Sequence, residues 1–168
     1  MTTRERTYQI MLWLSVVGLA IWLGGTLYQM LVIVPMWSHD PPTSVHAFFE
    51  GTRYNYTIWS FFGPPFMAAR LLPLLAALAL GWHLPMHRKW LLIAVAGMLF
   101  GVVFTLAYVY PMNEILFAKA GRGIPPDAVH DLVNSWILAD RIRFAVGCIA
   151  FLSLLRAFSL PIRGTTAS

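Results

Sequence analysis

PPFMAARLLPLLAALAL, residues 64–80, is an apolar stretch that carries a single charged side chain, Arg70. A guanidinium stays protonated in proteins, so this stretch holds a permanent cation near its middle. Other apolar stretches of similar or greater length lie on both sides of it in the sequence. Together they favour a chain that crosses a bilayer, and they make Arg70 the residue that most needs an explanation.

The composition of the whole chain indicates a membrane protein. Of its 168 residues, 58% are hydrophobic and 11% are charged, whereas an ordinary globular domain has roughly 25% charged residues. Four stretches approach or exceed the roughly 20 residues that cross a bilayer. The prediction is an all-α membrane protein with one domain over residues 1–168, a four-helix transmembrane bundle with helices at about 10–37, 60–82, 90–110 and 127–160.

The distribution of Lys and Arg predicts the orientation of the chain. These residues are dense in the short N-terminal segment, in the turn between helices 2 and 3 and in the tail, which places both termini in the cytoplasm beside an inner or plasma membrane. The longer connectors, residues 38–59 and 112–137, then lie outside and are predicted to fold into a small extracytoplasmic cap. Because basic residues flank the membrane at lipid head groups, the net charge of +5 predicts no nucleic-acid partner.

The sequence lacks the residues that several classes of redox protein require. Cys148 is the single cysteine, so the chain has no CxxC pair. No histidine falls inside the four apolar stretches, residues 10–37, 60–82, 90–110 and 142–160, which argues against a haem held by two such residues. A metal remains possible in the first outer connector, where His46 and Glu50 have i, i+4 spacing and His39 and His130 are further candidates. The alternative is a solvated amphipathic face.

Polar residues from all four helices fall in one layer of the outer half when depth is counted at about 1.5 Å per residue. A mid-membrane charge is costly, so Arg70 is expected to face the bundle interior and to pair with Asp140. Arg143 follows Asp140 by three residues, and Trp136 precedes it by four, so these residues share a helix face. The same layer contains Gln29, Thr105 and Tyr108.

Two arginines around one aspartate leave one positive charge uncompensated. That surplus predicts an anionic or oxygen-rich ligand. The alternative is structural: Arg70 extends toward the interface or links helices through Asp140, without touching a ligand.

The first outer connector is rich in aromatic residues. They are Phe48, Phe49, Tyr54, Tyr56, Trp59, Phe61 and Phe62. Such residues form belts at the membrane interface. The alternative is an aromatic opening that admits a flat hydrophobic molecule.

Two segments carry a resemblance to a known family. YPMNEILF (110–117) contains a P-x-N-x-x-L element, and WILADRIR (136–143) contains a W-x6-R element. Together with GGTLYQ (24–29) and the following Pro35, they resemble a family of four-helix membrane proteins that includes the anthrone oxygenases. Relatives commonly carry Asn or His at the position of Asp140.

The resemblance implies oxidation of an activated phenolic ring by O₂ without haem or flavin. Asp140 is then the candidate base. The other residues implied around the substrate are Arg70, Arg143, Asn113, Tyr108, Trp136 and Gln29. The ligand is expected to be a hydrophobic aromatic or quinone-like molecule, or a lipid. The alternatives to an oxidoreductase are a non-catalytic subunit or scaffold of a larger membrane complex, and a carrier of lipids or small molecules.

Overall fold

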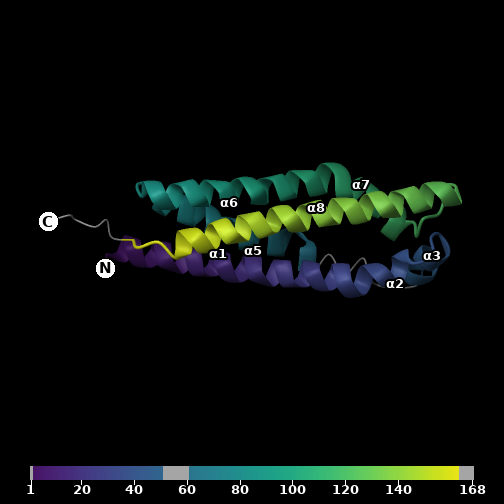
Figure 1. The fold of residues 1–168 in the computed structure, drawn as a ribbon, viewed down its shortest axis with the longest axis horizontal. Coiled ribbons are helices and arrows are strands. Elements are labelled where there is room, and N and C mark those ends of the chain that lie inside the picture. The colour runs from purple at the N-terminus through teal and green to yellow at the C-terminus, as the bar shows by residue number, and fades with distance from the viewer. Residues whose placement is uncertain (1, 51–60, 163–168) are drawn as a thin grey trace.

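The computed structural model describes residues 2–50 and 61–162, and within these ranges the chain is helical and contains no strand. The all-α prediction is therefore confirmed for the described part of the chain. Tyr54, Tyr56, Trp59 and the predicted start of the second helix at residue 60 lie outside it. The long helices run side by side along the longest axis of the molecule (Figure 1).

The first helical segment begins seven residues earlier than predicted. Helix α1 spans Thr3–Tyr28 and continues through the π-helical segment η1 (Gln29–Ile33) into α2 (Val34–Ser38). A capping box fixes its start: the Thr2 hydroxyl accepts from the Glu5 amide at 3.2 Å, and the Glu5 carboxylate accepts from the Thr2 amide at 2.7 Å. The helix begins at these polar contacts, ahead of the apolar stretch.

The second and third segments begin at prolines. Helix α5 spans Pro64–Leu80 and α6 spans Pro85–Phe104; proline suits the first turn because the missing N–H has no helical partner there. His87 therefore lies in the first turn of α6 and is buried, 2.8 Å from the Tyr8 hydroxyl and 3.1 Å from the Pro161 carbonyl. The third helical segment thus begins five residues before the predicted start at about residue 90, and its first turn includes His87.

The third segment does not end near residue 110. After α6 it continues through the π-helical segment η2 (Thr105–Val109), α7 (Tyr110–Asn113) and a second π-helical segment, η3 (Glu114–Ala118). Pro111 has no N–H, and its ring crowds the carbonyl four residues earlier. A wider π turn precedes it, just as η1 precedes Pro35, so both prolines are accommodated without ending the helix.

Helix α8 (Pro126–Phe158) runs unbroken for 33 residues and packs along α6 and against α1. Helix α5 packs on both α1 and α6. At the end far from the termini, the short helix α3 (Thr43–Phe49) packs against α2 and η3 (Figure 1). An exposed ion pair between Glu50 and Arg122 joins the first connector to the last one.

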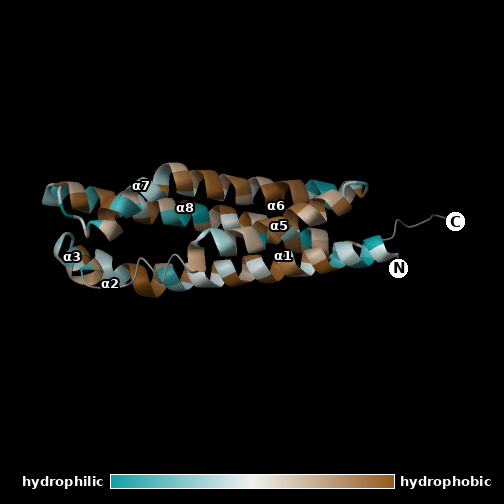
Figure 2. Cartoon of the chain, turned by 180° about the vertical axis from the view of Figure 1, so that it is seen from behind, coloured by the Kyte–Doolittle hydropathy of each residue, from teal (hydrophilic) through white to brown (hydrophobic). Residues whose placement is uncertain are grey.

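The outer surface is largely apolar. Among the described residues, two segments, Thr3–Ser38 and Pro85–Ala118, are long and apolar enough to cross a membrane by length and composition. Large side chains such as Leu31, Val103 and Leu152 are more than 60% exposed. Figure 2 shows hydrophobic residues along the middle of the long helices and hydrophilic ones near their ends.

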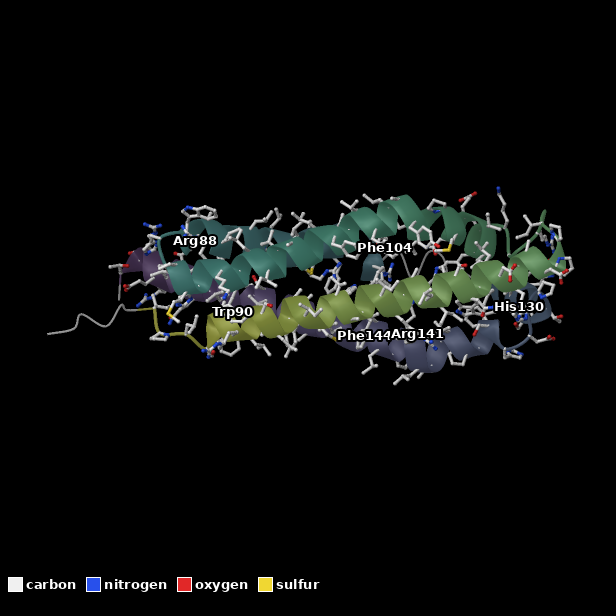
Figure 3. All side chains as sticks on the ribbon, turned by 45° about the horizontal axis from the view of Figure 1, so that its top comes forward. Arg88, Trp90, Phe104, His130, Arg141 and Phe144 are labelled. Atoms are coloured by element: carbon white, nitrogen blue, oxygen red, sulfur yellow. The ribbon has the colours of Figure 1, made fainter. Side chains whose placement is uncertain are left out.

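The two ends of the molecule carry different polar residues. Arg88 and Trp90 lie at the end that holds the termini, and His130 lies at the opposite end (Figure 3). At the first of these ends the Arg88 guanidinium stacks on Trp82 at 5.3 Å.

Candidate functional site

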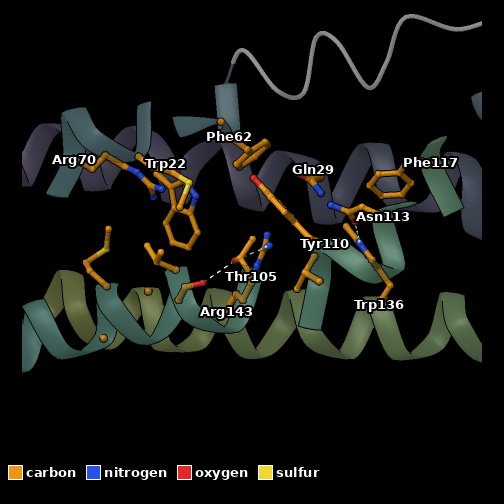
Figure 4. Close-up of a pocket in the computed structure, with 18 residues that line it drawn as sticks. Trp22, Gln29, Phe62, Arg70, Thr105, Tyr110, Asn113, Phe117, Trp136 and Arg143 are labelled. Carbon is orange, nitrogen blue, oxygen red and sulfur yellow. Dashed lines mark hydrogen bonds between the residues drawn. The ribbon is translucent and has the colours of Figure 1, made fainter. Parts of the chain in front are cut away.

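A cavity of about 110 Å³ lies among the long helices. The buried apolar residues of the protein form two clusters, and both contribute to the cavity wall. Met98 belongs to one cluster and Val109 to the other. The polar residues on the wall are Gln29, Arg70, Thr105, Tyr110, Asn113 and Arg143 (Figure 4). Five of the residues singled out in the sequence, Arg70, Arg143, Asn113, Gln29 and Trp136, thus meet at one cavity.

Arg70 is held by aromatic rings. Its side chain is 6% exposed, and its guanidinium carbon lies 4.8 Å from the centre of the Trp22 ring and 5.5 Å from that of Phe66. Within residues 2–50 and 61–162 it forms no ion pair, and its Nε is buried without a partner. The expected pair with Asp140 is therefore not formed. Cation–π contacts, about 2 kcal/mol or more when desolvated, take the place of the carboxylate.

Asp140, the carboxylate expected to pair with Arg70, pairs with Arg143. One of its terminal nitrogens donates to Asp140 Oδ1 at 2.7 Å, and the other donates to Thr105 Oγ1 at 3.3 Å. The Thr105 hydroxyl itself donates to the Gly101 carbonyl at 2.7 Å, which leaves its oxygen free to accept. The Arg143 guanidinium is therefore held by one residue of its own helix and by one residue of η2.

Asp140 lies off the cavity wall. Its side chain is 2% exposed and contacts Arg143, and it is absent from the residues that line the cavity. This position corrects the expectation that Asp140 touches a substrate as a base. It acts as the counter-charge that orients Arg143.

The charges at the cavity do not cancel. Arg70 and Arg143 both line it, Asp140 neutralises one of them, and the described lining residues include no acidic side chain. In a poorly solvated site the Coulomb energy between such a net positive charge and a nearby anion is larger than in water. The described wall of the cavity therefore carries a net positive charge, and the anionic ligand expected from two arginines and one aspartate stays a prediction.

The end of the cavity away from Arg70 carries amides. The Trp136 indole N–H donates to Asn113 Oδ1 at 2.6 Å. Because an indole nitrogen only donates, the Asn113 oxygen is committed to Trp136 and its NH₂ group is available to the cavity. Gln29, which is 5% exposed, lies beside Asn113 (Figure 4), and no hydrogen bond from the described residues engages its amide.

Tyr108 does not face the cavity. It is 48% exposed, with its ring 5.3 Å from that of Phe104. Tyr110 lines the cavity in its place. Tyr108 was selected by its depth along the helix, and the rise per residue does not tell which face a residue occupies. Tyr108 lies in the π turn η2, which holds more residues per turn than an α-helix. The available sequence signal for the π turn is Pro111, one residue after Tyr110.

We expect Tyr108→Leu to leave ligand affinity and any turnover within about twofold of the unchanged protein, because surface substitutions away from a site have small effects. Tyr110→Leu, which alters the cavity wall, is expected to change the affinity by more than that. Measurement of both variants by ligand titration checks the assignment. A loss confined to the Tyr108 variant would contradict it.

The outer connectors do not assemble the proposed metal ligands. Glu50 pairs with Arg122, and within residues 2–50 and 61–162 no group of three or more His, Cys, Asp or Glu side chains gathers around one point. His46, His39 and His130 are therefore not brought together with Glu50 as a set of ligands.

Two residues of the cavity wall, Trp22 and Gly147, were not predicted from the sequence. Trp22 lines the cavity and carries the Arg70 guanidinium on its ring. A Cβ at Gly147 would lie 2.4 Å from the Trp22 ring, so only glycine leaves room for the ring there. A glycine inside an apolar helix was the available signal, because such residues allow close helix contacts.

The model of a family described as anthrone oxygenase matches residues 53–153. This range includes Arg70, Asn113, Trp136 and Arg143 but neither Trp22 nor Gln29. No curated protein and no solved structure matches the chain.

Proposed function

The chain belongs to the anthrone oxygenase family, and from that premise we propose that it is an integral membrane protein that binds the anionic form of a hydrophobic aromatic molecule and promotes its oxidation by O₂. The observation that carries the proposal is the net positive charge that Arg70 and Arg143 bring to the cavity. Arg70 has no carboxylate partner among the described residues, so its charge is available to a ligand.

We place the four long segments across the bilayer as one transmembrane domain. The exposed apolar side chains along the middle of the helices support this arrangement, since a soluble monomer rarely exposes large apolar patches. Helix α3 and the described parts of the two long connectors form the extracytoplasmic cap in this arrangement. The termini lie on the cytoplasmic side, in accord with the density of basic residues near them.

The chemistry begins with an acidic C–H or O–H group of an anthrone-type ring system. Two guanidinium groups favour its deprotonated form, because the negative charge on oxygen is stabilised where it develops. The electron-rich ring carbon then forms a bond to O₂ and, with one proton, gives a hydroperoxide. Loss of water from the hydroperoxide leaves a carbonyl, so one O₂ converts a CH₂ group into C=O and H₂O.

The size of the cavity limits how such a molecule is held. At about 110 Å³ it is smaller than the roughly 150 Å³ cavity that admits benzene in an engineered protein. It therefore offers no more room than about one aromatic ring needs, so a larger ring system would enter it with only its oxygen-bearing edge. The remaining rings would lie toward Phe62, which lines the cavity and packs edge-to-face on Phe61 at 4.8 Å.

The purified chain in lipid nanodiscs, with no added cofactor, is expected to accelerate oxidation of anthrone over protein-free nanodiscs. Oxygen uptake and quinone absorbance are measured together, and one O₂ consumed per quinone formed is the expected ratio. The matched control is Arg141→Gln, which removes an exposed arginine two residues from Arg143 on the same helix; it should retain the full rate. A rate equal to that of empty nanodiscs would overturn the oxidation.

A further inference from the structure

Two polar contacts bridge α8 and the α6–α7 segment at the cavity. Arg143 contacts Thr105 at one level, and Trp136 contacts Asn113 at the other. Arg143 and Trp136 are seven residues apart on one helix, so the two levels are separated by about 10 Å. Residues from both levels line the same cavity, which therefore has a cationic end and an amide end (Figure 4).

The amide end presents hydrogen-bond donors. Trp136 occupies the oxygen of Asn113, and this contact fixes the orientation of the amide so that its NH₂ group is left over. Gln29 adds a second amide that is 5% exposed and unpaired with the described residues. A buried amide without a protein partner needs a ligand or water, so this end is built to meet an acceptor oxygen.

We infer that the ligand carries two oxygen functions at opposite ends of a flat ring: an anionic one held by Arg70 and Arg143, and a neutral carbonyl held by Asn113 and Gln29. Trp136 is a positioning residue, because it acts by keeping the Asn113 NH₂ group turned toward the ligand. In Figure 4, Tyr110 lies between the two ends, where it would flank the ring. The cationic half of this inference rests on the proposed function.

The test uses two small anions of equal charge and similar shape. 4-Acetylbenzoate has a carbonyl opposite its carboxylate, and 4-isopropylbenzoate has a hydrocarbon group there. Their affinities for the full chain in nanodiscs are measured by titration, with empty nanodiscs subtracted. We expect the acetyl compound to bind about five- to tenfold more tightly, the effect of one additional hydrogen bond.

Trp136→Phe removes the indole N–H and keeps an aromatic ring. Asn113 then loses the donor that orients it, so the preference for the acetyl compound should fall to less than about twofold while the affinity for the isopropyl compound holds. Trp13→Phe, at a 56% exposed position outside the cavity, should keep the preference. Arg70→Met should weaken both compounds to the same degree.

The outcomes separate the two proposals. Equal affinities in the unchanged protein, lost together in Arg70→Met, would overturn the amide end and support the anion site. A preference that survives Trp136→Phe would overturn the positioning role. A preference that survives while Arg70→Met changes neither affinity would overturn the anion site of the proposed function. Binding of neither compound would overturn both.

Discussion

Arg70→Met is expected to lower kcat/KM for anthrone oxidation by about 100-fold or more and to leave the protein at least as resistant to unfolding as before. Removal of one preorganised donor to a developing oxyanion costs about 10²–10³ in rate. Stability should hold because Arg70 pairs with no carboxylate in the described part of the chain, so its removal strands no opposite charge. The cation–π contacts are lost, but the cost of burying a guanidinium is lost with them. Methionine can pack on Trp22 and Phe66, the rings that now hold the guanidinium.

The measurements are steady-state oxidation rates in nanodiscs and the thermal unfolding midpoint of the same samples. Arg70→Lys, which keeps the charge without the planar fork, should retain an intermediate rate. Arg141→Gln again serves as the control. If Arg70 only links helices, Arg70→Met would instead unfold at a clearly lower temperature while the folded fraction kept its rate, and that result would refute the site.

Gly147→Ala should destabilise the protein by about 1–3 kcal/mol, the usual cost of overpacking a core, and weaken ligand binding by about tenfold or more. The added Cβ would lie 2.4 Å from the Trp22 ring and 3.2 Å from the Leu23 side chain. The indole must shift to relieve this contact. Because Arg70 lies 4.8 Å over that ring, the guanidinium would move with it and the cationic end of the cavity would be distorted.

Gly101→Ala is the matched control for stability. Gly101 also lines the cavity and also lies in a long helix, but no atom lies within 4 Å of a Cβ built there. Its unfolding free energy should stay constant or rise by up to about 1 kcal/mol, the helix-propensity difference between the two residues. Equal destabilisation of both variants, measured by denaturant titration, would show that the contact with Trp22 is not what matters.

Much of the site could be predicted from the sequence because burying charge in an apolar chain is so costly. The rarity of polar residues in the apolar stretches was enough to select Arg70, Arg143 and Gln29, and helical rise was enough to place them at similar depth. Asn113 was implied by the resemblance to the family. Trp136 followed from the four-residue spacing to Asp140. All of these except Asp140 line the cavity.

The partners of these residues were harder to predict. Charge counting favoured a carboxylate for Arg70, whereas Trp22 and Phe66 supply ring faces, and an aromatic residue in an apolar helix carries no mark that distinguishes this role. The placement of Tyr108 failed for a different reason: it rested on depth alone, which does not fix the helix face, and the π turn that precedes Pro111 also departs from regular helical periodicity.

The η2 turn has a consequence for how this architecture can diversify. Its i, i+5 hydrogen bonds spread over about five residues the rotation that an α-helix completes in about four, so a one-residue deletion within Thr105–Val109 would restore ordinary winding without turning the segment beyond it. Tyr110 and Asn113 would stay on the cavity side, and α6 would keep its contacts with α8. A residue gained or lost at this point thus changes which side chains the turn itself presents, without a substitution in the half of the protein that holds the helices together.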